Sequence, residues 1–225
     1  MSVQKQDAAS IKVLIAGISG SGKSTLFQKL ICRVRGVKWI FLYDHKGGDL
    51  ARRFGVRPCY TPEDLMDAVL RGGFVIFNPS KHYPGKPEIG FEFFCRFVWA
   101  VCQELKGKKI FGADELDALV DSRCKPDDLC IILDQGRTFE IECYFIAHAA
   151  NTIHNGVRKQ ITEIFAMKQG DKNGTEWLEE KTFNHEELFA LKPGQWIYKN
   201  TNTGETKSGG SAFIPKNSGR DLRGL

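Results

Sequence analysis

The chain has 225 residues, of which 42% are hydrophobic and 26% charged, the balance of a folded domain rather than of a disordered chain. Its 32 lysines and arginines outnumber its 27 aspartates and glutamates by five, a net charge that permits contact with a polyanion without requiring it. The length leaves room for one large domain with a small appendage and excludes several catalytic modules.

The cysteines and the apolar runs indicate whether the protein contains disulfides, zinc sites or membrane-spanning helices. The seven cysteines are odd in number, and no two have the C-x-x-C spacing of a zinc or redox site. Most of them lie in apolar runs, so we expect reduced thiols that pack as small core residues. No apolar stretch reaches the roughly 20 residues that a bilayer-spanning helix needs, and we expect no integral membrane segment.

In the first half of the chain, short apolar runs alternate with helical patterns, which favours a parallel sheet covered by helices. Thr61 is a good helix N-cap because Pro62 and two acidic residues follow it. The expected elements are strands at 12–16, 38–43 and 74–77 and helices at 23–33, from Thr61 to Gly72, and at 91–105.

The second half continues the alternation and ends in a polar segment. We expect strands at 109–113, 143–147, 164–167 and 195–198, a helix at 127–135 and a short helix capped by Asn184. The resulting organisation is a polar N-terminal segment (1–10), one folded domain (11–200) and a glycine-rich basic C-terminal tail (201–225).

The clearest motif matches G-x-x-x-x-G-K-[ST] and consists of Gly17, Ile18, Ser19, Gly20, Ser21, Gly22, Lys23, Ser24 and Thr25. It follows an apolar strand and opens a helix, the context in which backbone N–H groups and the positive end of the helix dipole surround phosphates. Lys23 is placed to reach the β- and γ-phosphates and the Ser24 hydroxyl to bind Mg²⁺. The motif therefore predicts binding of a nucleotide, which we take to be ATP with Mg²⁺.

A pair of acidic residues follows the strand at 109–113. Asp114 is placed to hold Mg²⁺, and Glu115 to orient and polarise the water that attacks the γ-phosphate. The adjacent pair favours hydrolysis over phosphate transfer to a bound hydroxyl. A competing interpretation is that two acids simply begin a helix.

Other classes of P-loop protein fit less well. Asp44 to Gly47 matches D-x-x-G, but no N-K-x-D motif of a GTPase follows, and no L-S-G-G-Q-like stretch of a transporter ATPase is present. A small P-loop kinase stays open, because Arg35, Arg52, Arg53 and Arg57 would serve to bind an acceptor phosphate.

Arg137 and His148 bracket a third strand of interest. Ligands of open α/β sheets lie at the carboxyl ends of strands, so His148 is placed to sense the γ-phosphate. Arg137 lies near the opposite end of that strand, which favours contact with the nucleotide of a neighbouring subunit over its own. A surface arginine and a structural core histidine are the competing interpretations.

Three segments together resemble the FtsK–HerA superfamily of DNA-pumping ATPases, and within it the genome-packaging ATPases of membrane-containing icosahedral viruses. They are GISGSGKST (17–25), IFGADE (110–115) and GRTFEIECYFIAHAANTIHNGVRKQITEIFAM (136–167), with LKPGQWIYKN resembling the family's last strand. The resemblance implies an α/β, three-layer P-loop NTPase of the additional-strand, RecA-like type, with a mainly parallel central sheet flanked by helices.

The resemblance also implies roles for individual residues. It places Lys23 and Ser24 at the phosphates and Mg²⁺, Asp114 at the metal, and Glu115 as catalytic base. Arg137 corresponds to a finger acting in trans. The sensor of the family is usually glutamine, and His148 occupies that position here.

Finally, the resemblance implies a viral genome-packaging ATPase that forms a homo-oligomeric ring, usually a hexamer, and moves DNA without sequence specificity. It implies work in the host cytoplasm, at a capsid vertex or beside membrane-associated virion proteins. An assembly or secretion ATPase of filamentous-phage type is the alternative within the superfamily. Basic residues suited to DNA phosphates follow the second and third strands: Lys46, Arg52, Arg53, Arg57, Lys81, His82 and Lys86.

Overall fold

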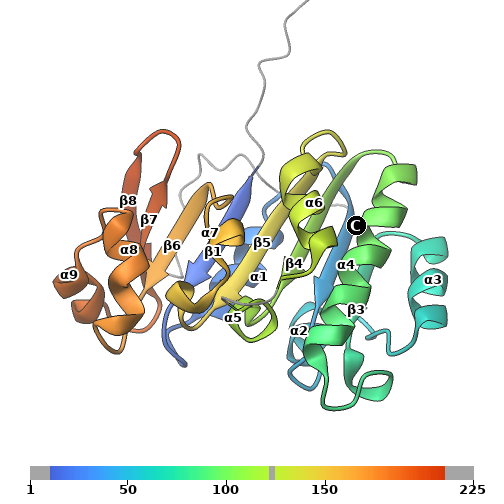
Figure 1. Cartoon of the computed structure of the whole chain (residues 1–225). Coiled ribbons are helices and arrows are strands. Elements are labelled where there is room, and N and C mark those ends of the chain that lie inside the picture. Colours follow the sequence, from blue (N-terminus) through green and yellow to red (C-terminus); the bar gives the residue numbers. More distant parts are fainter. Residues whose placement is uncertain (1–10, 122–124, 211–225) are drawn as a thin grey trace, which may run out of the picture.

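The computed structural model describes residues 11–121 and 125–210, and it consists of one eight-stranded sheet with helices on both faces (Figure 1). The strands, in chain order, are β1 (Lys12–Ala16), β2 (Val37–Tyr43), β3 (Phe74–Phe77), β4 (Lys108–Ala113), β5 (Ile141–Ala147), β6 (Glu163–Met167), β7 (Gln195–Asn200) and β8 (Thr206–Gly210). Their order across the sheet is β3-β2-β4-β5-β1-β6-β7-β8.

The helices divide between the two faces of the sheet. One face packs against α1 (Lys23–Ile31) and α2 (Asp49–Phe54). The other packs against α3 (Pro62–Arg71), α4 (Pro87–Glu104), α5 (Leu116–Leu119), α6 (Asp127–Gln135), α7 (Asn155–Arg158), α8 (Glu176–Glu180) and α9 (His185–Ala190). Short 3₁₀ turns are η1 (Pro79–Lys81), η2 (Ala150–Thr152) and η3 (Asn173–Thr175).

The strand order is that of an additional-strand P-loop fold. From β3 to β6 neighbouring strands are parallel, and β7 and β8 then pair antiparallel. β5 lies between β1, which leads into the glycine-rich loop, and β4, which leads into the acidic pair. The predicted fold class is confirmed, and the carboxyl ends of β1, β4 and β5 meet at one edge of the sheet.

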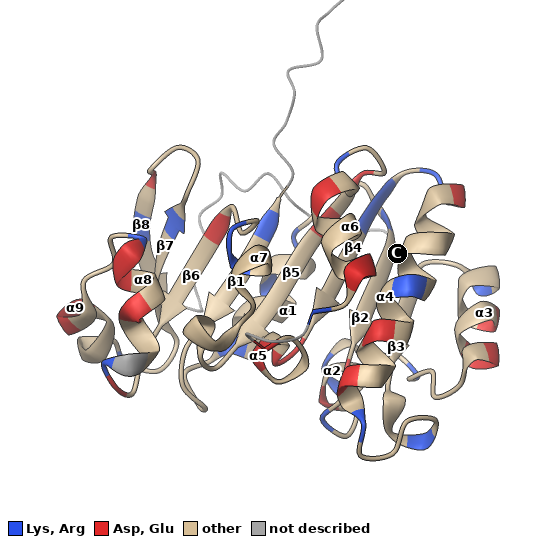
Figure 2. Cartoon of the chain, in the orientation of Figure 1, with Lys and Arg blue, Asp and Glu red and all other residues tan. Residues whose placement is uncertain are grey.

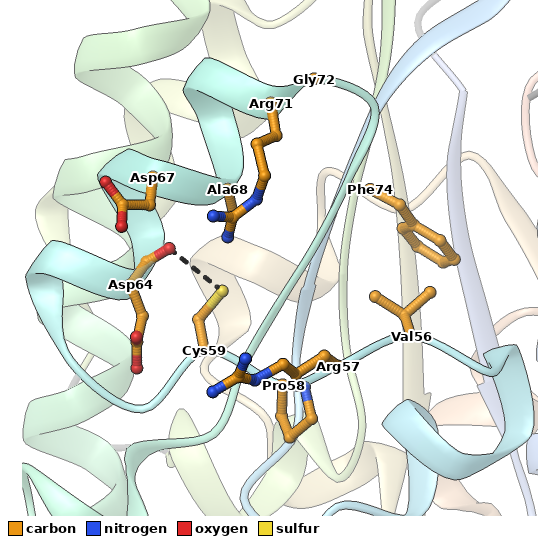
Figure 3. A pocket seen from close by; sticks show the side chains of 10 residues that line it. All are labelled: Val56, Arg57, Pro58, Cys59, Asp64, Asp67, Ala68, Arg71, Gly72 and Phe74. Atoms are coloured by element: carbon orange, nitrogen blue, oxygen red, sulfur yellow. Dashed lines mark hydrogen bonds between the residues drawn. The ribbon is translucent and has the colours of Figure 1, made fainter.

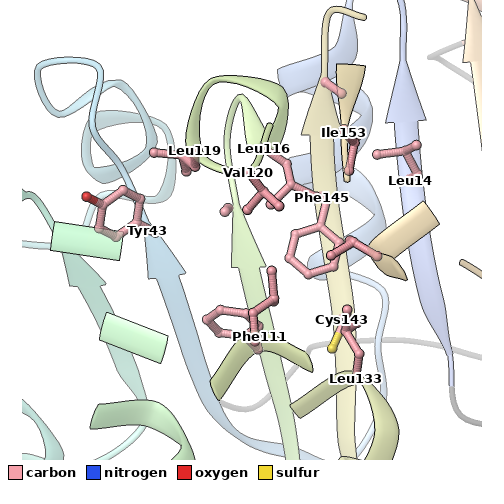
Figure 4. Packing of buried hydrophobic residues seen from close by; sticks show 14 of the residues in the cluster. Leu14, Tyr43, Phe111, Leu116, Leu119, Val120, Leu133, Cys143, Phe145 and Ile153 are labelled. Carbon is pink, nitrogen blue, oxygen red and sulfur yellow. The ribbon is translucent and has the colours of Figure 1, made fainter. Parts of the chain in front are cut away.

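The core follows from the alternation of side chains along each strand. In β1, Val13 and Ile15 point to the face covered by α1, whereas Leu14 and Ala16 point to the opposite face. Central parallel strands are buried on both faces and therefore read as continuous apolar runs. Figure 4 shows the larger cluster, in which Phe111 of β4 packs beside β5.

Two helix starts match the capping residues that the sequence predicts. Thr61 Oγ1 accepts a hydrogen bond from Asp64 N–H, and the Asp64 carboxylate accepts one from Thr61 N–H, which completes a capping box for α3. Asn184 Oδ1 accepts hydrogen bonds from the N–H groups of Glu186 and Glu187 at the start of α9. Local side-chain chemistry decides both boundaries.

The segment from 201 onward differs from the expected tail. After a turn, β8 continues the sheet at Thr206–Gly210, so the folded part extends at least ten residues beyond position 200. Gly209 makes this possible, because a Cβ there would lie 2.6 Å from the Trp196 ring. Residues 211–225 and 1–10 lie outside the described residues.

The structure contains a helix, α2, that the sequence analysis did not predict. It has six residues, too few to show a helical periodicity, and it starts at Gly48, whose φ is 84°. The Asp44 carboxylate accepts hydrogen bonds from the N–H groups of Leu50 and Ala51 and so stabilises its first turn.

The cysteine prediction is confirmed for the part of the chain that is described. Cys59, Cys95, Cys102 and Cys143 are buried free thiols, and no disulfide joins any described cysteine. Within residues 11–121 and 125–210, none of the helices has the length and apolar character that crossing a bilayer requires.

Candidate active site

The glycine-rich loop joins β1 to the first turn of α1. Gly20 and Gly22 have φ angles of 75° and 102°, a region that residues with side chains rarely adopt. At Gly17 an added Cβ would lie 3.0 Å from Met167 Cβ and 3.1 Å from Lys168 O. Gly22 offers no side-chain cap to α1, which leaves the N–H groups of the first turn available to an anion.

One buried group in the loop indicates what would bind there. The Ser21 hydroxyl is buried and has no hydrogen-bond partner among the described residues. Buried hydroxyls in folded proteins are normally paired. A phosphate oxygen inside the loop would satisfy it, so the residues of the loop fit the phosphates of a nucleotide.

Lys23 turns its ammonium group into the loop. Lys23 Nζ donates hydrogen bonds to Gly17 O at 2.6 Å and Ile18 O at 2.8 Å. Burial lowers the pKa of Lys23 to about 8, and the Asp114 carboxylate opposes this shift. The loop thus gathers a buried ammonium and uncapped helix N–H groups around one position.

The acidic pair follows β4 at the same edge of the sheet. Asp114 and Glu115 are each 7% exposed, and Asp114 Oδ1 accepts a hydrogen bond from Glu115 N–H at 2.9 Å. Burial, and then repulsion from Glu115, raises the pKa of Asp114 to about 6. Glu115 has a φ of 50°, a left-handed conformation that costs a non-glycine residue about 1–3 kcal/mol.

Glu115 is the centre of the polar contacts at this edge. Its carboxylate forms an ion pair with Lys46 and lies 2.6 Å from His148 Nε2 and 3.5 Å from His45 Nε2. Burial acts to raise the pKa of Glu115, but the hydrogen bonds from Lys46 and His148 outweigh it and lower the pKa. The Glu115 side chain is therefore held as a carboxylate.

His148 links the acidic pair to the glycine-rich loop. While Nε2 faces Glu115, its other ring nitrogen, Nδ1, lies 3.2 Å from Lys23 Nζ. A ring with its proton on Nε2 satisfies both contacts, donating to Glu115 and accepting from Lys23. The structure thus brings together Lys23 of α1, Glu115 at the N-cap of α5 and His148, the residue after β5.

The side chain of Asp117, on α5, holds the backbone of His148 in place. The Asp117 carboxylate accepts hydrogen bonds from His148 N–H at 3.1 Å and Ala149 N–H at 3.0 Å. The helix that starts at the acidic pair is thereby tied to the carboxyl end of β5. Nothing in the sequence pattern distinguishes Asp117 from other acids near a helix start.

His45 and Lys46 are the site residues that sequence reasoning missed. Lys46 was expected among the DNA-facing basic residues, and the structure places it against Glu115 instead. Both residues follow β2, which pairs with β4, so their position depends on strand order. Strand order is a tertiary property, and no motif around 45–46 reveals it.

Arg137 lies away from this cluster. It is exposed in the turn between α6 and β5, at the amino end of β5, whereas His148 follows the carboxyl end. The strand between them has seven residues, a separation of roughly 20 Å. Contact with a nucleotide bound to its own chain is excluded by this distance.

Comparison with known proteins shows which solved structures have the same fold as this chain. Neither a family model nor a curated protein matches this sequence. The DNA-packaging ATPase B204 from Sulfolobus turreted icosahedral virus is 18% identical and superposes with a TM-score of 0.67, covering 88% of this chain and 96% of B204. The chain therefore shares its fold with this packaging ATPase.

Two further solved structures share this fold. The genome packaging NTPase B204 of Sulfolobus turreted icosahedral virus 2, in complex with AMPPCP, is 14% identical with a TM-score of 0.67 over 88% of this chain and 96% of its own. VirB4 of Thermoanaerobacter pseudethanolicus is 11% identical with a TM-score of 0.65, over 96% and 93%. The fold-level resemblance inferred from the three segments is confirmed.

Proposed function

We propose that this protein is a viral genome-packaging ATPase that couples ATP hydrolysis to the movement of DNA into a preformed capsid. The observation that carries the proposal is the line of contacts from Lys23 through His148 to Glu115. It joins a phosphate-binding loop to a carboxylate base across the additional strand. The fold shared with B204 and the chain's content of basic loops support the choice of DNA as cargo.

The residues divide the chemistry of hydrolysis among them. Lys23 and the loop N–H groups would hold the β- and γ-phosphates of ATP, and Ser24 and Asp114 would hold Mg²⁺. The metal ion would neutralise part of the charge on the phosphate oxygens. The ionised Glu115 accepts a hydrogen bond from the attacking water and takes its proton. His148, in contact with both Lys23 and Glu115, reports the state of the γ-phosphate to the base.

The DNA side of the proposal rests on charge and position. The basic residues that follow β2 and β3 lie on α2, in η1 and in the loops beside them. These segments are at the carboxyl edge of the sheet, the lower part of Figure 2. In a homo-oligomeric ring, a hexamer by the resemblance, such loops repeat around a channel and their positive potential adds. We place the ring in the host cytoplasm and at a capsid vertex, where virion proteins dock it.

The deciding experiment measures ATP turnover with and without DNA, together with the native mass. We expect DNA of unrelated sequences to raise turnover equally, and the mass of a ring rather than of a monomer. A monomer that transfers phosphate to a nucleoside, with no response to DNA, would instead establish the kinase alternative.

A secretion or assembly ATPase is the second candidate, because the cytoplasmic domain of the Type VII Secretion ATPase EccC of Thermomonospora curvata also superposes on this chain, with a TM-score of 0.57 at 14% identity. The fold serves both classes, so superposition does not separate them. A protein cargo predicts a ring whose turnover is indifferent to DNA, which the same measurement detects.

Lys46→Met should raise DNA-independent ATP turnover several-fold. Lys46 competes with the attacking water for the Glu115 carboxylate, and methionine keeps the length of the side chain without the charge. Steady-state ADP release measures the effect. Lys81→Met, which removes a lysine stacked on Tyr60, is the control and should leave turnover unchanged. Unchanged or reduced turnover in Lys46→Met would show that Lys46 does not restrain Glu115.

Arg137→Ala should inactivate neighbouring subunits in mixed rings. An arginine that completes the site of the next subunit makes each variant chain disable a wild-type site, so activity falls more steeply than dilution predicts. Mixing titrations at fixed total protein measure the curve. A strictly proportional loss would remove Arg137 from the neighbouring site.

A further inference from the structure

A cavity of about 470 Å³ lies at the β3 edge of the sheet, between α3 and residues 56–59 (Figure 3). Residues 56–59 reach β3 through backbone hydrogen bonds, Cys59 N–H to Ile76 O and Asn78 N–H to Cys59 O, both 2.8 Å. The cavity therefore has one wall of extended backbone and one of helix.

Two arginines face this cavity from opposite walls. In Figure 3 the guanidinium groups of Arg57 and Arg71 lie on either side of the Cys59 thiol. Neither side chain forms an ion pair or hydrogen bond with any residue that the structure describes. Burial, and then the Asp64 carboxylate, raises the pKa of Cys59 to about 11, and both arginines act against this shift.

Among the described residues, neither acid that lines the cavity forms an ion pair with Arg57 or Arg71. Asp64 Oδ2 accepts hydrogen bonds from Tyr60 N–H and Thr61 N–H, at 2.9 and 3.2 Å, as part of the α3 cap. The Asp67 carboxylate points away from both guanidinium groups in Figure 3.

Arginines on the neighbouring helix show the contrasting arrangement. Arg52 and Arg53 of α2 both pair with Asp49, at 3.4 and 2.7 Å. The cavity residues Arg57 and Arg71 have no such partner among the described residues.

We propose that Arg57 and Arg71 together bind a phosphate group in this cavity, and that the phosphate belongs to the backbone of DNA. Guanidinium groups present planar pairs of N–H donors that match phosphate oxygens. Val56 and Phe74 line the same cavity and offer an apolar surface to the adjoining sugar. The choice of DNA rests on the proposed function, whereas phosphate binding rests on the cavity alone.

The site is separate from the nucleotide loop. β3 is four strands from β1 in the sheet, a distance of roughly 20 Å. Cys59 pairs with Phe77 at the last residue of β3, so the cavity reaches the carboxyl edge where the basic loops also lie. A DNA phosphate bound there would lie on the same edge as Glu115 without entering the ATP site.

The first arm of the test uses inorganic phosphate as the probe. In a Lys23→Ala background, which removes the main cation of the nucleotide loop, we expect phosphate binding by calorimetry or ³¹P NMR to remain. It should be lost when Arg57→Ala and Arg71→Ala are added. No binding in the background variant, or equal binding after the arginines are removed, would overturn the site.

The second arm measures DNA affinity against salt in the otherwise wild-type chain. The Arg57→Ala, Arg71→Ala double variant should bind DNA roughly tenfold more weakly, and the slope of log K against log salt should fall by about 0.9. The charge-matched control, Arg52→Ala with Arg53→Ala, should change the slope less, because those arginines are already paired.

The two arms separate the source of the phosphate. Phosphate binding with an unchanged DNA slope would show that the cavity takes free phosphate, and would overturn the DNA assignment. A wild-type chain that does not bind DNA would contradict the proposed function and the DNA assignment together, while the phosphate arm would still decide the cavity.

Discussion

Glu115→Gln should retain ATP binding and lose about 10²- to 10⁴-fold in turnover. Glutamine keeps the volume and one carbonyl oxygen, which still accepts a hydrogen bond from His148 or Lys46, but it does not take a proton from water. The loop residues proposed to bind phosphate are untouched. Binding of a fluorescent ATP analogue and single-turnover hydrolysis measure the two properties separately.

Glu104→Gln is the matched control for this substitution. Glu104 is an exposed glutamate at the end of α4 and makes no contact with the site, so turnover should equal that of the wild type. Glu115→Gln with unchanged turnover would exclude Glu115 as the catalytic base. Loss of nucleotide binding would indicate instead that the left-handed backbone at Glu115 depends on its charge contacts.

Phe111→Ala should lower the free energy of unfolding by about 3–5 kcal/mol. Phe111 is fully buried in the middle of β4, and its ring lies 6.0 Å from both Phe94 and Phe145 and 6.3 Å from Phe91. Truncation leaves a cavity that the two faces of a close-packed sheet do not fill. Because β4 leads directly into Asp114 and Glu115, ATP turnover should also fail at a lower temperature.

The effect is measured by urea unfolding and by the melting temperature, which should fall by roughly 10 °C for a chain of this size. Leu70→Ala, at a position 80% exposed on α3, removes a similar apolar group from the surface and should change the free energy of unfolding by less than about 0.5 kcal/mol. A loss below about 1 kcal/mol in Phe111→Ala would contradict the packing of β4 against α4.

Local patterns predict the elements that carry strong local signals. The strands at 12–16 and 74–77 and the helix at 127–135 have the predicted limits, because continuous apolar runs and a proline before two acids leave few alternatives. β8 escapes prediction because its five residues, TKSGG, carry almost no apolar signal. Its place depends on pairing with β7 and on the fit of Gly209 against Trp196, which are contacts between residues apart in the chain.

The candidate site likewise has one part that the sequence predicts and another that depends on the tertiary structure. The sequence by itself determined the glycine-rich loop and the acidic pair, because each is a short run whose backbone and side chains act within a few residues of one another. Only the tertiary structure decided which side chains surround Glu115. His45 and Lys46 reach it because β2 pairs with β4, and His148 reaches Lys23 because β5 lies between β4 and β1. Strand order brings together residues about 70 to 125 positions apart, and local spacing carries no information on it.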